Sequence, residues 1–153
     1  LAKFIGVWTY YSAIPALPLV YQVILYAATQ PSPYEATGQL DLGPVISSYI
    51  GIWLFGGAAL AVGLGLAALA ENQVIAGFLG IAALFVLWLG DFAGQVVPNR
   101  AIAEAIRALS LQAHYSTSFL IGVIRFEDAV FFIGLIVVML FITTRVLESR
   151  RWR

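Results

Sequence analysis

Few side chains in this sequence of 153 residues could carry out chemistry. There is one histidine, His114, and no cysteine, and the single lysine is Lys3. The lack of cysteine excludes disulfides and thiolate metal sites, and a single histidine excludes a haem held by two histidines. Lys3 belongs to no GxxxxGK motif, so the chain is not itself a P-loop ATPase. We expect no catalytic residue, cofactor or metal.

The polar residues nearest to apolar segments each have a structural interpretation. Asp91 follows an apolar run at 74–90, and an acid inside a membrane is a functional candidate by default. An acid at a helix end can also reach the interface, and we favour that interpretation. Glu127 and Asp128 suit the first turn of a helix, where the helix dipole favours negative charge. We expect His114 in a loop, solvated or capping a helix.

The composition is that of a membrane protein. Hydrophobic residues make up 61% of the chain and charged residues 10%, against about 25% charged in soluble domains. A chain this short cannot bury so much apolar surface in one water-soluble core. Crossing a hydrocarbon core of ~30 Å takes roughly 20 apolar residues in a helix. Four segments meet this length, so we predict an all-α integral membrane protein with four transmembrane helices, at about 4–29, 45–70, 74–94 and 126–147.

The short connection and the charges predict a topology. Only Glu71, Asn72 and Gln73 separate the second and third spans, which therefore form an antiparallel hairpin. With four spans both termini lie on one side, and basic residues favour the cytoplasm. That side holds five basic residues (Lys3, Arg145, Arg150, Arg151, Arg153) and two acids (Glu71, Glu148). The other holds three basic residues (Arg100, Arg107, Arg125) and six acids (Glu35, Asp41, Asp91, Glu104, Glu127, Asp128). We predict that both termini are cytoplasmic.

Two spans contain residues that affect helix geometry. Pro15 and Pro18 lie inside the first span and predict a kink near Ala13, because proline removes a backbone donor and clashes with the preceding turn. They are candidates for a hinge, although plain architecture is the favoured interpretation. The second span is rich in small residues that allow helices to approach closely; the candidate helix-packing residues form two pairs with small-xxx-small spacing, Ala59 with Gly63 and Ala61 with Gly65.

An external cap is expected at 98–125, before the last span, while a polar, turn-rich loop at 30–44 joins the first two spans. The run Asn99–Ala113 reads as one amphipathic helix with Asn99 as N-cap. On its polar face Glu104 can pair with Arg100 or Arg107. We expect this helix on the membrane surface or capping the bundle. The apolar run 119–124 is too short to cross and is expected to dip into the outer leaflet as a short helix.

Two parts of the sequence resemble a known family. The hairpin from Gly51 to Gly77, with its Glu71-Asn72-Gln73 turn, is similar to the spans that precede the last one in ABC-2 type exporter permeases, in the branch of the gliding-motility and multicopper-enzyme-maturation permeases. The C-terminal run from Leu111, ending Arg145-Val146-Leu147-Glu148-Ser149-Arg150-Arg151-Trp152, supports the same resemblance.

The resemblance implies a function and partners. Such permeases have six spans, work in pairs and associate with two cytoplasmic ATP-binding subunits. The spans here would be the third to the sixth, so this chain would be a C-terminal fragment whose first two spans precede Leu1. The turn at 71–73 would face the ATPase, and the span at 74–94 would lie near the subunit interface. The implied location is the bacterial cytoplasmic (inner) membrane, with no nucleic acid as partner.

We therefore read the chain as the permease subunit of an ATP-driven exporter whose partner hydrolyses ATP. The rival hypothesis is a non-catalytic accessory or scaffold subunit of a photosynthetic or respiratory complex, which needs neither an ATPase nor a polar pathway. An intramembrane enzyme is disfavoured, because no convergent polar residues lie within the spans.

Overall fold

The computed structural model describes residues 1–28 and 41–151, and the described chain is helical without any β-strand. Most of the loop predicted at 30–44 and the terminal residues Trp152 and Arg153 lie outside the described residues. The elements are α1 (Ala2–Ala28), α2 (Leu42–Leu69), α3 (Gln73–Val96), α4 (Arg100–Leu109), α5 (Leu111–Ser116), the 3₁₀ helix η1 (Phe119–Ile121) and α6 (Phe126–Arg151).

Four of these helices are long and apolar enough to cross a membrane. They are α1, α2, α3 and α6, with mean hydropathies of 1.4, 2.1, 2.1 and 2.5. The prediction of an all-α protein with four membrane-spanning helices and short helices before the last span is confirmed. The helix ends differ from the predicted bounds by a few residues; α2, for example, begins at Leu42 because Asp41 caps it by accepting a hydrogen bond from the Gly43 N–H at 3.0 Å.

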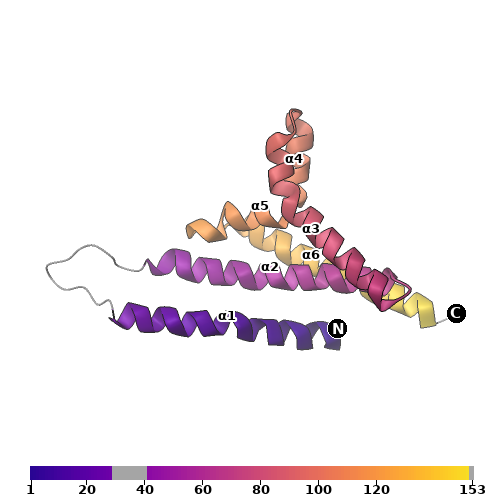
Figure 1. The fold of residues 1–153 in the computed structure, drawn as a ribbon, viewed down its shortest axis with the longest axis horizontal. Helices are drawn as coiled ribbons and strands as arrows, with labels where there is room; N and C mark the ends of the chain where they lie inside the picture. The colour runs from indigo at the N-terminus through magenta and orange to yellow at the C-terminus, as the bar shows by residue number, and fades with distance from the viewer. Residues whose placement is uncertain (29–40, 152–153) are drawn as a thin grey trace.

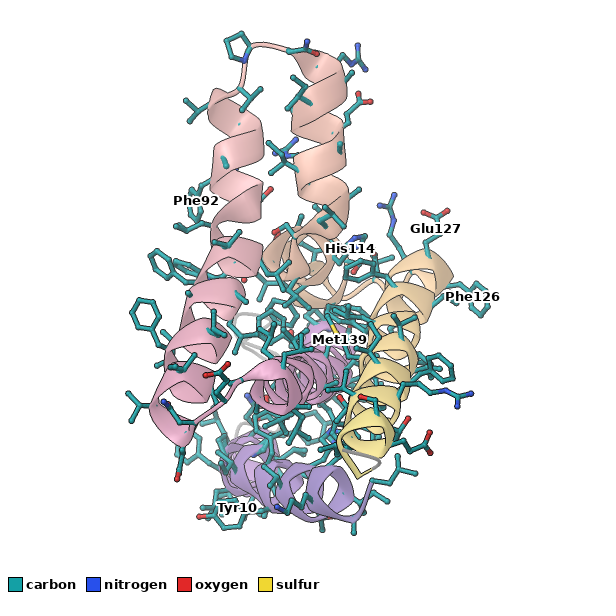
Figure 2. The ribbon with its side chains drawn as sticks, turned by 90° about the vertical axis from the view of Figure 1, so that its right-hand side faces the viewer. Tyr10, Phe92, His114, Phe126, Glu127 and Met139 are labelled. Carbon is teal, nitrogen blue, oxygen red and sulfur yellow. The ribbon has the colours of Figure 1, made fainter. Side chains whose placement is uncertain are left out.

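The central helix of the fold is α2. Figure 1 shows α1 and α6 running alongside α2, with the N-terminus and the end of α6 at the same end of the molecule. Seen along α2, α1, α3 and α6 surround it on different sides (Figure 2). Among the described elements, the backbone of α1 comes close to α2 alone. The second half of α3 leaves the bundle and forms an antiparallel hairpin with α4 (Figure 2).

The core lies where α2, α6 and the cap meet. Its most buried large side chains are Phe119 of η1 and Phe132 of α6, each with 0% of its surface exposed. On the α2 side the core combines Leu54 with the small residues Ala58 and Ala61. Small side chains on the central helix allow the aromatic rings of its neighbours to approach its backbone.

The cap contains two helices where one was predicted. The continuous helix expected at Asn99–Ala113 is wrong, because Ser110 ends α4 and begins α5. The Ser110 hydroxyl accepts a hydrogen bond from the Ala113 N–H at 3.3 Å and donates one to the Leu87 carbonyl of α3 at 3.1 Å. A serine at an N-cap stabilises a new helix start, so the chain turns at this residue while it stays bound to α3. The N-cap role predicted for Asn99 is confirmed, since its side chain accepts from the Ala101 N–H at 3.1 Å.

The apolar run predicted as a short helix at 119–124 is shorter in the structure. Its helical part, η1, ends at Gly122, whose φ of 87° lies in the left-handed region that favours glycine. A Cβ at this position would also lie 3.0 Å from Cγ of Pro44, at the start of α2. The chain therefore turns sharply at Gly122 and returns to begin α6.

Candidate functional site

The turn at 71–73 is open to partners. Glu71, Asn72 and Gln73 are all exposed, and they join α2 to α3 at the end of the molecule where α6 ends (Figure 1). Asn72 is the N-cap of α3, and its side-chain oxygen accepts from the Ile75 N–H at 2.9 Å. Of the three, Asn72 therefore has a structural role, while the carboxylate of Glu71 is free to meet another molecule at this surface.

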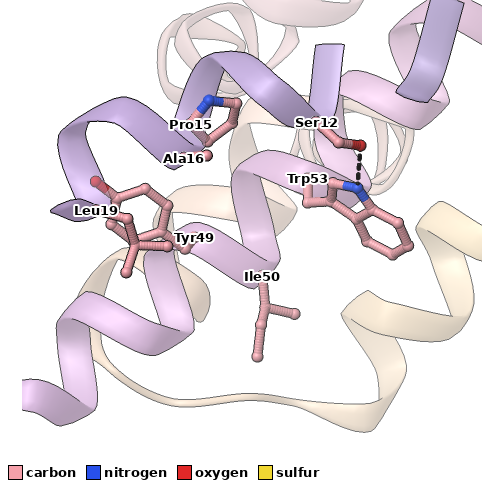
Figure 3. Close-up of a pocket in the computed structure, with 7 residues that line it drawn as sticks. All are labelled: Ser12, Pro15, Ala16, Leu19, Tyr49, Ile50 and Trp53. Atoms are coloured by element: carbon pink, nitrogen blue, oxygen red, sulfur yellow. Dashed lines mark hydrogen bonds between the residues drawn. The ribbon is translucent and has the colours of Figure 1, made fainter. Parts of the chain in front are cut away.

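The two prolines lie beside a cleft. The helix α1 continues through both Pro15 and Pro18, and Pro15 faces α2 (Figure 3). A cleft of about 270 Å³ opens here between the two helices, lined mainly by apolar side chains: Ser12, Pro15, Ala16, Leu19, Tyr49, Ile50 and Trp53. The predicted hinge at the prolines stays a prediction, but its place is now defined: Pro15 borders the cleft between α1 and α2.

Next to the cleft, toward the N-terminal end of α1, aromatic residues hold α1 against α2. Trp8 and Trp53 stack with ring centroids 4.4 Å apart, and Trp53 donates its indole N–H to the Ser12 hydroxyl at 2.7 Å (Figure 3). The Tyr11 hydroxyl donates to the Ile52 carbonyl at 2.9 Å. Gly56 of α2 lies directly under the Tyr11 ring, so a side chain at this position would collide with it. These contacts were not predicted, because partners about 40 residues apart give no local signal.

Two of the four candidate packing residues of α2, Gly65 and Gly63, face different neighbours. Gly65 faces α6, where a Cβ would lie 3.4 Å from Sδ of Met139, and Ala61 is fully buried. Gly63 faces α3, where a Cβ on Gly80 would lie 4.0 Å from the Gly63 Cα. Ala59 is half-buried. A Cβ on Gly63 itself would meet no atom within 4 Å, so this position is less crowded than the small-xxx-small pattern suggested.

The acid at the end of the third span is paired. Asp91 forms an ion pair with Arg107 of α4, with 3.3 Å between Oδ1 and Nε. The predicted pairing of Arg100 with Glu104 is confirmed at 2.9 Å, whereas Arg107 turns to α3 and binds Asp91. The ion pair explains how an acid can lie beside an apolar helix: its charge is balanced by a residue of the cap.

His114 corrects an expectation. It belongs to α5, not to a loop, and its ring lies between the cap and the first turn of α6 (Figure 2). Its Nδ1 is 2.6 Å from Oδ1 of Asp128, and its Nε2 is 3.1 Å from the Ala108 carbonyl. Asp128 is buried, with 5% of its surface exposed. Asp128 therefore lies next to His114 as well as in the first turn of α6, where the helix dipole favours its charge. The sequence offered no sign of this pair, because the two residues belong to different helices.

The chemistry open to the described residues is limited. Burial raises the pKa of the Tyr115 hydroxyl in α5, and a hydrogen bond with Ser48 opposes this shift. No group of three potential metal ligands occurs within residues 1–28 and 41–151. The arrangement suits binding and packing. Comparison with protein-family models, with curated proteins and with solved structures finds no match.

Proposed function

We propose that this chain is a transmembrane permease subunit of an ABC-2 type exporter, driven by ATP that a separate subunit hydrolyses. The observation that carries the proposal is the exposed turn of Glu71, Asn72 and Gln73. It joins two membrane-spanning helices with almost no slack, so a protein that binds the turn acts directly on both helix ends. In this proposal the turn and both termini face the cytoplasm, as the distribution of basic residues favours.

The central position of α2 supports a mechanical role for this turn. With 28 residues, α2 extends ~42 Å from the turn to the cap at its other end. There the Ser48 hydroxyl donates to the Phe119 carbonyl at 3.3 Å, and Gly51 lies against the rings of Phe119 and Tyr115. A displacement of the turn would be carried by one helix to the cap, and to α1 through the stacked tryptophans.

The proposed assembly contains a second permease subunit as well as the ATPase, and its substrate passes through the bilayer of a bacterial inner membrane. The alternative is an accessory or scaffold subunit of a photosynthetic or respiratory complex. One observation favours it: α3 carries a row of exposed aromatic residues (Phe78, Phe85, Trp88, Phe92) that suit contact with other hydrophobic subunits.

Crosslinking from the turn tests the proposal. Because the chain has no cysteine, Glu71→Cys provides a single attachment point that leaves the Asn72 cap intact. Glu127→Cys, which replaces an exposed acid at the start of α6 and so at the other end of the bundle, is the matched control. After crosslinking in native membranes, we expect an ATP-binding protein attached to position 71 and not to position 127.

The outcome also separates the two hypotheses. An ATP-binding protein that copurifies and hydrolyses ATP, while the isolated chain does not, supports the permease. Crosslinks from position 71 that capture other membrane subunits and no ATP-binding protein would contradict it and favour the scaffold.

A further inference from the structure

The cleft between α1 and α2 is narrow and elongated. On α1 its lining begins at Ser12 and ends at Leu19, a distance of ~10 Å at ~1.5 Å per residue. Leu19 and Tyr49 lie at one end of the cleft, and Ser12 and Trp53 lie at the other (Figure 3). Its volume of about 270 Å³ is below the ~300–1,000 Å³ of pockets that enclose drug-sized ligands. The cleft therefore suits a slim, extended group better than a compact molecule.

The lining of the cleft offers little to a polar ligand. None of the seven lining residues is charged. The Ser12 hydroxyl already donates to the Trp8 carbonyl at 2.8 Å and accepts the indole N–H of Trp53 at 2.7 Å. The other hydroxyl of the lining belongs to Tyr49. A bound water needs about two to four polar partners, so these walls disfavour water as well as charged ligands.

The cleft lies at the depth of lipid acyl chains. Since α2 is ~42 Å long and a hydrocarbon core is ~30 Å thick, about 6 Å of each end of a centred α2 lies outside the core. Tyr49 and Trp53 are ~10 Å and ~16 Å along α2 from its first residue, which places them ~4–10 Å inside the core. This is the half of the bilayer on the side of η1, because Gly122 lies against Pro44 at that end of α2.

The cleft is also continuous with the lipid-facing surface of the protein. In the most apolar segment of α1, 0% of the residues are buried inside the protein, so lipid surrounds this helix wherever α2 does not touch it. Leu19 of α1 and Ile50 of α2 both line the cleft, and they are 40% and 38% exposed. An acyl chain can therefore enter the cleft sideways from the bilayer without passing a charged group.

We propose that the cleft between α1 and α2 binds one acyl chain of a phospholipid from this leaflet, and that the chain completes the contact between the two helices. An empty cleft would leave its walls without dispersion contacts on one side, and a methylene chain restores these contacts at no polar cost. The stacked rings of Trp8 and Trp53 close the end of the cleft that is farther from η1. The site is independent of whether the protein is a permease or a scaffold subunit.

Fluorescence quenching by brominated lipid tests the site. Trp53 lines the cleft, and the chain has four tryptophans. A chain with Phe at the other three positions (Trp8→Phe, Trp88→Phe and Trp152→Phe) keeps Trp53 as its sole reporter. A second chain keeps Trp88 alone, which is exposed on α3 and reports lipid at an open surface. Both full-length chains are placed in nanodiscs of phosphatidylcholine with bromine on its acyl chains.

Two substitutions in α1 separate a chain in the cleft from lipid around the protein. Ala16→Phe places a ring in the cleft, since Ala16 belongs to its lining. Ile14→Phe is the matched control, because Ile14 is 56% exposed and lies ~200° around the helix from Ala16. We expect bromine to quench Trp53 in the unsubstituted cleft. Most of this quenching should be lost in Ala16→Phe and kept in Ile14→Phe, while quenching of Trp88 should be equal in all chains.

Four outcomes would overturn the proposal. Equal quenching of Trp53 in Ala16→Phe and Ile14→Phe would mean that bromine reaches the ring from outside the cleft. Quenching of Trp53 by iodide in the water phase would show a cleft filled with water. Loss of quenching when two copies share a nanodisc would assign the cleft to a second copy of the chain. The fourth needs neither substitution in α1: brominated lipid that quenches Trp88 and leaves Trp53 unquenched would refute the site even if Ala16→Phe failed to fold.

Discussion

The most apolar 18-residue segments of α2 and α3 have the same mean hydropathy, 2.1, yet 44% of that segment of α2 is buried inside the protein and only 11% of that of α3. Both contain several glycines. Two of those in α2 are covered by large rings from other elements: Phe119 and Tyr115 over Gly51, and Tyr11 over Gly56. In α3, Gly77 meets no atom within 4 Å, and Gly90 and Gly94 lie against α4 and its C-cap Ser110.

The difference shows that hydropathy and burial are separate properties in a membrane protein. Hydropathy decides whether a helix enters the bilayer, because lipid and protein are equally apolar surroundings. Burial depends on whether a neighbour has a side chain of the right shape to fill the space above a glycine. Substitutions matched between α2 and α3 should therefore differ in effect although the two helices are equally apolar.

The largest difference is expected for a ring that fills a space next to α2. Phe119→Ala removes a fully buried ring and should lower the free energy of unfolding by about 3 kcal/mol, the low end for this substitution in a core, because lipid adds no hydrophobic term. Phe85→Ala removes a ring of α3 that is 57% exposed and should cost less than about 1 kcal/mol. Unfolding in mixed micelles measures both; equal losses would contradict the comparison.

A side chain added to each helix should give the next largest difference. Gly51→Val places a branched side chain against the Phe119 Cβ, a rigid neighbour, and should destabilise the protein by about 2 kcal/mol, as in overpacked cores. Gly77→Val extends into open space and should stay within about 0.5 kcal/mol of the original. The melting temperatures of the two variants in the same detergent decide this; a Gly51→Val variant as stable as Gly77→Val would place the cap elsewhere.

A smaller difference is expected for the tryptophans. Trp53→Phe keeps an aromatic ring over Trp8 but loses the hydrogen bond to Ser12, and should cost about 0.6–1 kcal/mol. Trp88→Phe in α3 is its control, with no such bond among the described contacts. Unfolding in mixed micelles measures both variants. A loss in Trp53→Phe no larger than that in Trp88→Phe would mean that Trp53 does not hold α1 against α2 in this way.

The smallest effect concerns the ion pair between α3 and α4. The Arg107 side chain is 49% exposed, and exposed pairs contribute less than about 1 kcal/mol. Arg107→Gln should therefore lower the free energy of unfolding by less than about 1 kcal/mol. At high salt the variant should be as stable as the unsubstituted chain. A large loss that persists in high salt would show that Asp91 lies in a much less polar environment.

The sequence predicted the parts of this fold that depend on length and local pattern. The four spans follow from apolar runs, and the start of α4 follows from Asn99, whose side chain bonds to nearby backbone as predicted. The same role of Asn72 at the start of α3 was not predicted. It did not predict the break at Ser110, because the apolar spacing continues across that residue.

The side-chain pairs of the candidate sites could not be predicted either. A helix that is apolar on every side carries no periodic signal for the face that meets its neighbours, so the positions of Trp8 over Trp53 and of Phe119 over Gly51 required the structure. The pairing of His114 with Asp128 was missed for a related reason: the carboxylate suits a helix start equally well with or without a partner.

Among the described elements, the backbone of α1 comes close to α2 alone, and this has a consequence for how the protein is assembled in the bilayer. Membrane helices insert individually and then associate, and α3 and α6 can each pack against α2 without α1. Separation of α1 from α2 would therefore disturb the packing of the other helices least. Variation in bilayer thickness or lateral pressure would act first on this helix, and the cleft beside Pro15 would widen or close as α1 tilts.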